Sequence, residues 1–152
     1  MDPTAPIISG HSLGGIVLGT HVDPVLAEAY AEGRQVEFIV YTHGDKVQHT
    51  YRIDGGTVTV NANAQGAIVS LSCQPPYQGT YEGKLWPGMS VAQIKAVTQK
   101  QMLIFSVLVL DNEWGVCFEL PPPYDEYDYI DEMPDDFILN KLFVRLKNWR
   151  GY

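Results

Sequence analysis

The sequence lacks the features that mark secreted and membrane proteins. Its two cysteines, Cys73 and Cys117, are too few for a disulfide scaffold, and each lies in an apolar strand-like run that favours a buried thiol. No apolar window reaches the roughly 18 residues that a membrane span needs. The N-terminus has neither a basic region nor a long apolar stretch, so no secretory signal is expected. We therefore expect a cytoplasmic protein that forms a single domain over residues 1–152.

Basic residues are missing from residues 111–136, and this gap accounts for the net charge of −8. The stretch holds 10 of the 18 acids and none of the 10 Lys and Arg residues, so the rest of the chain carries 8 acids and 10 bases. Tyr124, Tyr127 and Tyr129 are interspersed among the acids. Such a surface suits a basic partner, and it argues against nucleic acid, whose phosphates would be repelled.

One short motif suggests catalysis. Residues 10–15, Gly-His-Ser-Leu-Gly-Gly, resemble the nucleophile elbow of lipases and other α/β-hydrolases, with Ser12 as the nucleophile. In that family several strands precede the elbow and the histidine follows late in the chain. Here only 9 residues precede the motif, and all 4 histidines lie before residue 50. We therefore expect no enzymatic activity and interpret the glycines as turn residues; a small serine hydrolase is the alternative.

No metal ion or cofactor is predicted. His43 and His49 lie near Asp45, but no further ligand converges on them in sequence. The carboxylates of residues 125–136 could bind Ca²⁺, yet they lack the spacing of a calcium loop. No glycine-rich phosphate-binding loop is present.

Two segments, residues 16–25 and 85–94, share a pattern of apolar and glycine positions. Each segment predicts a short apolar stretch, followed by a glycine turn and then a short helix. The helices are predicted over residues 22–32 and 90–100. Ser90 and Gln93 have capping-box spacing in the second; in the first, Thr20 with Asp23 offers a weaker capping box, and Asp23-Pro24 is itself a helix start. Gly33 should end the first helix. The matching positions are Ile16, Gly19, Val22 and Val25 in one segment and Leu85, Gly88, Val91 and Ile94 in the other.

Antiparallel strands are predicted after each helix. The run over 102–110 is apolar on both faces and should form a single central strand. The fold class is therefore α+β, with two pseudo-repeats at about 14–73 and 83–146 joined by a linker over 74–82. Each repeat is one helix plus an antiparallel meander, with the helices packed on one face of an antiparallel sheet. The other expected strands are residues 35–42, 47–53, 57–61 and 67–73 in the first half, and 114–120 and 137–146 in the second.

This layout resembles the tandem helix–sheet repeats of the β-lactamase inhibitor protein and of small bacterial outer-membrane lipoproteins with that fold. The resemblance rests on the turn over residues 87–90 (Pro-Gly-Met-Ser) with its following helix, and on a weaker match to the same pattern at residues 19–25. More broadly, a small acidic α+β protein without a catalytic set resembles the immunity proteins of bacterial toxin systems, including contact-dependent growth inhibition. That resemblance implies a cytoplasmic inhibitor that binds a toxin domain. An envelope-assembly or ligand-binding module with the same fold is a further alternative.

The acidic segment, residues 119–136, is the predicted binding site. At 18 residues it is longer than a loop usually is without function or disorder. Tyrosines supply contact area at low entropic cost, and carboxylates complement Lys and Arg. We expect the segment to occupy the basic groove of a toxin, most naturally a nuclease, as a phosphate mimic; a merely solvated loop is the alternative. The predicted contact residues are Tyr124, Asp125, Glu126, Tyr127, Asp128, Tyr129, Asp131, Glu132, Asp135 and Asp136.

Overall fold

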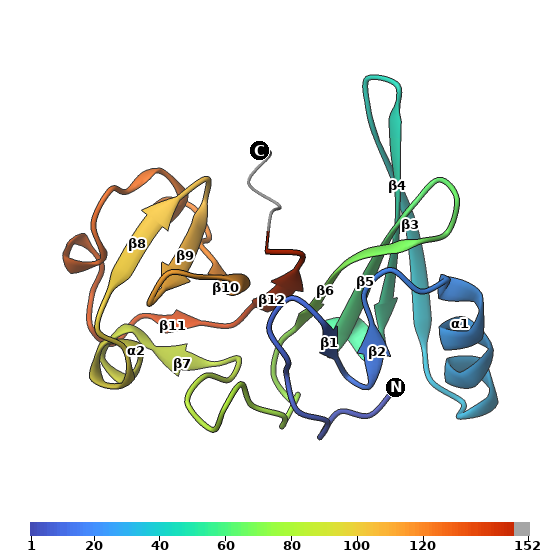
Figure 1. The fold of residues 1–152 in the computed structure, drawn as a ribbon, viewed down its shortest axis with the longest axis horizontal. Coiled ribbons are helices and arrows are strands. Elements are labelled where there is room, and N and C mark those ends of the chain that lie inside the picture. The colour runs from blue at the N-terminus through green and yellow to red at the C-terminus, as the bar shows by residue number, and fades with distance from the viewer. Residues whose placement is uncertain (148–152) are drawn as a thin grey trace.

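The computed structural model describes residues 1–147 and has a mixed α+β fold dominated by one large antiparallel sheet (Figure 1). Eight strands pair in the order β3-β4-β5-β6-β12-β10-β9-β8. Strand β12 therefore lies at the centre, between the strands of the first half and those of the second. The strands are β3 (Val36–His43), β4 (Lys46–Ile53), β5 (Val58–Asn63), β6 (Ile68–Cys73), β8 (Gln101–Ile104), β9 (Val107–Leu110), β10 (Glu113–Glu119) and β12 (Leu142–Arg145).

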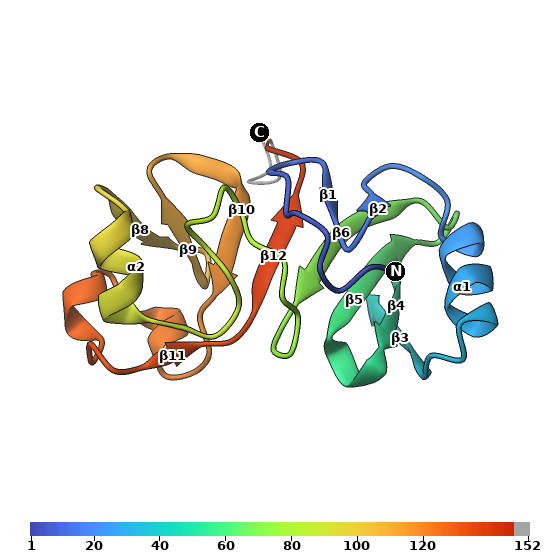
Figure 2. The ribbon, with the colours of Figure 1, turned by 90° about the horizontal axis from the view of Figure 1, so that it is seen from below.

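Two α-helices, α1 (Val22–Ala31) and α2 (Val91–Val97), lie near opposite ends of the sheet (Figure 2). Two short ribbons accompany them: β1 (Ser12–Leu13) pairs with β2 (Ile16–Val17), and β7 (Met89–Ser90) pairs with β11 (Ile138–Leu139). Within residues 1–147, neither helix is long and apolar enough to cross a membrane.

Both ends of helix α1 are set by residues next to them in the chain, and the residue that caps its start differs from the prediction. The side chain of His21, not Thr20, caps the helix, because its Nδ1 accepts a hydrogen bond of 3.1 Å from the backbone N–H of Asp23. The hydroxyl of Thr20 instead donates to the carbonyl of Val17. At the other end, Gly33 adopts a left-handed φ of 73°, which confirms the predicted stop.

Helix α2 begins with the predicted capping box. Ser90 Oγ accepts from the backbone N–H of Gln93, and Gln93 Oε1 accepts from the backbone N–H of Ser90. The helix ends at Val97, earlier than predicted, because Thr98 has extended backbone angles. Its hydroxyl donates to the carbonyl of Ile94, which closes the last turn.

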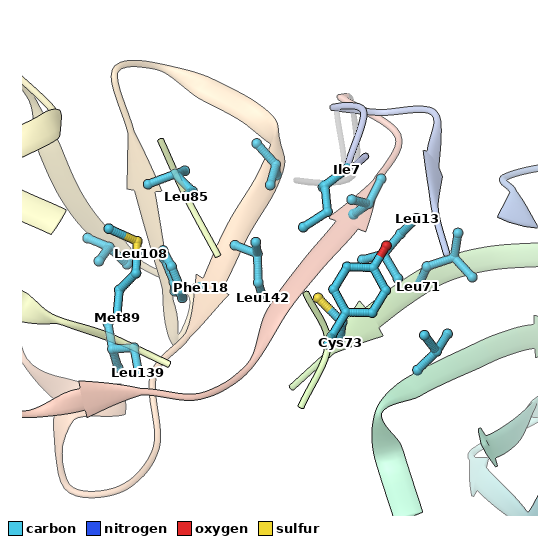
Figure 3. Packing of buried hydrophobic residues seen from close by; sticks show 14 of the residues in the cluster. Ile7, Leu13, Leu71, Cys73, Leu85, Met89, Leu108, Phe118, Leu139 and Leu142 are labelled. Carbon is cyan, nitrogen blue, oxygen red and sulfur yellow. The ribbon is translucent and has the colours of Figure 1, made fainter. Parts of the chain in front are cut away.

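The main hydrophobic core lies on one face of the sheet. Leu142 on β12 pairs with Cys73 on β6 and with Phe118 on β10, so one buried row crosses the boundary between the halves (Figure 3). Both helices and the β1–β2 ribbon add side chains to the same buried cluster: Val22 and Ala29 from α1, Val91 and Ile94 from α2, and Leu13 and Ile16 from the ribbon. This face is therefore covered, and the opposite face of β4, β5 and β6 is polar.

The prediction of one central strand over residues 102–110 is wrong. The run forms a hairpin, β8 and β9, whose turn residues Phe105 and Ser106 have φ values of 52° and 64°. Two consecutive positive φ values are typical of the tight turn that joins antiparallel strands. Strand β8 lies at the edge of the sheet, and only β9 is buried on both faces. The run predicted over 137–146 is likewise divided, into β11 and β12.

Candidate functional site

The acidic segment folds around the end of the sheet that carries β8 and α2 (Figure 1). It contains two short 3-10 turns, η2 (Tyr124–Glu126) and η3 (Ile130–Glu132). Ile130 and Met133 point inward and belong to the hydrophobic core. The segment is thus attached to the domain by apolar side chains placed between its acids.

The three tyrosines of the acidic segment have different environments. Tyr124 packs edge to face against Tyr127 and against Phe137, with ring centroids 5.0 and 4.6 Å apart. Both tyrosines are half-buried against the core. Tyr129 is 71% exposed. The structure therefore places Tyr124 and Tyr127 as anchors and leaves Tyr129 as the ring most available to a partner.

Some carboxylates of the acidic segment have partners on the same chain. Lys95 Nζ on α2 lies 2.9 Å from Asp131 Oδ1 and 3.3 Å from Asp135 Oδ1. The hydrogen bond to Asp131 is the main cause of the raised pKa of Lys95. Glu132 Oε1 accepts from the backbone N–H of Tyr129 and so stabilises η3.

Other carboxylates of the segment remain unpaired. Glu126, Asp128 and Asp136 are exposed, and within residues 1–147 none forms an ion pair or a side-chain hydrogen bond. Asp125 is half-exposed, and its backbone carbonyl accepts from Ser106 Oγ at 3.4 Å. These carboxyl groups face solvent without a cationic partner among the described residues, which is the condition for long-range attraction of a cation.

The acids outside the predicted contact set have structural partners. Asp111 Oδ1 accepts from the backbone N–H groups of Gln99 and Lys100. Glu119 Oε2 lies 3.4 Å from Lys141 Nζ. The acidic composition of residues 111–136 therefore combines fold-stabilising groups with an exposed surface.

The catalytic alternative gains no support from geometry. Ser12 lies in β1, opposite Val17 of β2, and is 7% exposed. The motif therefore forms a small ribbon, whereas a nucleophile elbow joins a strand to a helix. Within the described residues no histidine hydrogen bonds to the Ser12 hydroxyl, and no group of three His, Cys, Asp or Glu side chains is placed to hold a metal ion.

A polar hollow on the face of the sheet opposite the core was not predicted from the sequence. It has a volume of about 410 Å³ and is lined mainly by β4, β5, β6 and β12. Hydroxyl and amide side chains form its floor, and Arg52, Lys141 and Arg145 line it as well. The only signal in the sequence is the alternation of polar with apolar residues in β5 and β6, which any solvent-facing strand can show.

No protein-family model matches the chain, and no curated protein matches its sequence. The structure is similar to the crystal structure of the uncharacterized protein YfeY from Escherichia coli, with a TM-score of 0.61. The match has 11% sequence identity and covers 91% of this chain and 98% of YfeY. At this identity the similarity shows a shared fold and nothing about activity or partners.

Proposed function

We propose that this protein is a cytoplasmic inhibitor of the immunity-protein type that binds a basic toxin domain and blocks its substrate groove. The observation that supports it is the set of exposed, unpaired carboxylates on Glu126, Asp128 and Asp136 beside the exposed ring of Tyr129. A nuclease is the toxin class that best fits this surface, because its groove must attract phosphates. The proposal includes no nucleic acid, membrane, metal ion or cofactor.

The anchoring of the acidic segment favours binding over mere solvation. Ile130 and Met133 hold the backbone of the segment on the core, and Tyr124 is fixed against Phe137. A surface that is already ordered loses less conformational entropy when it binds. The carboxylates would speed the encounter with a basic partner, and salt would weaken that effect.

A charge-reversal experiment tests the proposal. The candidate toxin, encoded by the neighbouring gene, is co-expressed with this protein and the complex is purified at low and high salt. Replacing Asp125, Glu126 and Asp128 together by Lys should weaken the complex by orders of magnitude, because three attractive charges become repulsive. The melting temperature should stay nearly constant, since none of these side chains has an ion-pair partner within residues 1–147.

A matched control separates this site from the general effect of net charge. Replacing Glu37, Asp45 and Glu82 together by Lys makes the same change in net charge at exposed positions outside the acidic segment, and the only ion pair that it removes within residues 1–147 is the exposed one of 4.0 Å between Glu37 and Arg52. This control should bind the toxin almost as tightly as the wild type. Equal losses in both triple variants, or no loss in either, would remove the acidic segment as the binding site.

We also propose that the halves of the chain are pseudo-repeats of one helix followed by an antiparallel meander. The order of elements supports this: α1 precedes β3, β4, β5 and β6, and α2 precedes β8, β9, β10 and β12. The sheet order places the last strand of each half at the shared centre. Superposition of residues 14–73 on residues 83–146 tests it, and a match of the helices without the strands would contradict it.

A further inference from the structure

The floor of the polar hollow is built by cross-strand register. On the face opposite the core, two rows of side chains run across neighbouring strands, each crossing β4, β5, β6 and β12. Because adjacent strands lie about 4.8 Å apart, side chains in one row are direct neighbours. One row consists of Arg52, Thr59, Ser72 and Phe143, and the other of Thr50, Asn61, Ser70 and Arg145.

The second row is held rigid by its own hydrogen bonds. Thr50 Oγ1 donates to Asn61 Oδ1 at 2.8 Å, and Asn61 Nδ2 donates to Ser70 Oγ at 2.8 Å. Gln48 adds a bond of 3.1 Å from Nε2 to Thr50 Oγ1. These groups therefore have fixed orientations before any ligand arrives.

The first row offers two hydroxyl groups that the protein leaves unpaired. Thr59 is 9% exposed and Ser72 is 3% exposed, and both line the hollow. Within residues 1–147, neither hydroxyl forms a hydrogen bond with another protein group. Both hydroxyl oxygens are open to the hollow, because among the described residues no fully buried side-chain polar atom lacks a hydrogen-bond partner. Their partners therefore come from the hollow, as water or as a ligand.

The charge of the lining is opposite to that of the whole chain. Arg52, Lys141 and Arg145 line the hollow with only one acid, Glu119, whereas the chain carries a net charge of −8. The guanidinium of Arg145 lies 4.8 Å from the centre of the Phe143 ring. Burial lowers the pKa of Arg145, although an arginine stays protonated at neutral pH. A partly desolvated cation of this kind forms strong hydrogen bonds with oxyanions.

We propose that the polar hollow binds a small oxyanion carried on a hydroxyl-bearing carbon skeleton, the chemistry shared by sugar phosphates and sugar acids. Arg52 and Arg145 hold the anionic group, and the hydroxyls of Thr59 and Ser72 hydrogen bond to its oxygens. The ligand hydroxyls meet the amides of Gln48 and Asn61. The volume lies within the range of small-molecule sites, about 300–1,000 Å³, and the polar lining selects a hydrophilic ligand.

The hollow meets the acidic segment only at Glu119, which is not one of the predicted toxin contacts, so either proposal can fail alone. Isotope-labelled full-length protein is titrated with glucose-6-phosphate, glucuronate, inorganic phosphate and glucose, and backbone amide shifts are recorded. We expect saturable shifts in β4, β5, β6 and β12 with both glucose-6-phosphate and glucuronate. The ratio of the two affinities shows whether the site prefers a phosphate or a carboxylate. Glucose alone should cause none. Equal affinity for inorganic phosphate and glucose-6-phosphate would overturn recognition of the carbon skeleton.

Variants of the lining provide the second arm. Arg52→Gln and Arg145→Gln should each weaken binding about tenfold or more, because each removes a charge-assisted hydrogen bond. Thr59→Val keeps the shape of the side chain, deletes one unpaired hydroxyl, and should weaken binding about threefold to tenfold. Lys100→Gln, an exposed change of the same charge outside the hollow, should leave affinity unchanged. Absence of saturable shifts with every anion, or equal loss in Lys100→Gln, would overturn the proposal.

Discussion

Lys95 on α2 lies 2.9 Å from Asp131 in η3, and the same ammonium group lies 3.3 Å from Asp135. A single helical side chain therefore connects two points of the acidic segment to the second half of the sheet. The pairs are exposed to solvent, so their main effect is on the position of the segment and much less on global stability.

Replacing Lys95 by Gln should loosen the acidic segment. Both ion pairs would be lost, while Ile130 and Met133 would still pack in the core. We expect faster amide hydrogen exchange over residues 131–136 and unchanged exchange in β5 and β6. Lys84→Gln, which removes a charge that forms no ion pair within the described residues, is the control. Equal exchange in wild type and Lys95→Gln would mean that the apolar anchors alone fix the segment.

Replacing Met133 by Ala should lower the free energy of unfolding by about 2–4 kcal/mol. The side chain is 3% exposed and lies in the core cluster, so its truncation leaves a cavity. Tyr129→Ala, four residues earlier in the same segment, should change stability by less than about 0.5 kcal/mol because the ring faces solvent. Urea unfolding of the two variants measures the difference, and similar losses would show that the segment packs differently.

The carboxylate of Glu113 should stabilise the folded protein at neutral pH, and this stabilisation should be lost in acid. Burial alone would raise its pKa, but hydrogen bonds from Ser9 Oγ and the Gly115 N–H, together with Lys147 at 3.5 Å, lower the pKa below its ordinary value. A carboxyl with a lowered folded-state pKa contributes stability above its unfolded value of about 4.3, and this contribution is lost as the pH falls through the folded value.

The variant Glu113→Gln tests this dependence. At neutral pH the free energy of unfolding of this variant should be about 1 kcal/mol lower than that of the wild type. The difference should shrink below about pH 4. Glu126→Gln, which removes an unpaired carboxylate, should give a curve parallel to that of the wild type. A difference for Glu113→Gln that is constant over the whole pH range would contradict the assignment.

The two thiols should react only after unfolding. Cys73 lies in the main core cluster, whereas Cys117 lies in a separate cluster with Phe143 on the opposite face of the sheet. The sheet therefore separates them, and both are free. Burial raises the pKa of both, that of Cys117 to about 12. Titration with a thiol reagent at mildly alkaline pH should detect almost no thiol in the native protein and both thiols in denaturant.

Elements with local chemical signals could be predicted from the sequence. The capping box of Ser90 and Gln93 and the helix stop at Gly33 both depend on residues close in the chain. The turn at Phe105 and Ser106 carries no such signal, since neither residue favours a positive φ. Only the pairing of β8 with β9 reveals it.

The candidate sites show the same division between local and long-range information. The charge density of the acidic segment is a property of composition, so the exposure of Glu126 and Asp128 could be anticipated. The burial of Tyr124 depends on Phe137, which approaches only in the folded chain. The polar hollow depends on register, because Arg52 and Arg145 are far apart in sequence and meet the same floor only across β5 and β6.

The central position of β12 constrains the order in which the fold can be completed during translation. Among the described residues, β12 (residues 142–145) is the last strand to be synthesised, yet it pairs with both β6 and β10 and joins the two halves of the sheet. Until β12 leaves the ribosome, β6 and β10 each present an unpaired edge, and the two halves share no sheet. Closure of the sheet is therefore a late event that follows synthesis of nearly all of the described chain, and a nascent chain halted before Leu142 would remain as two open half-sheets.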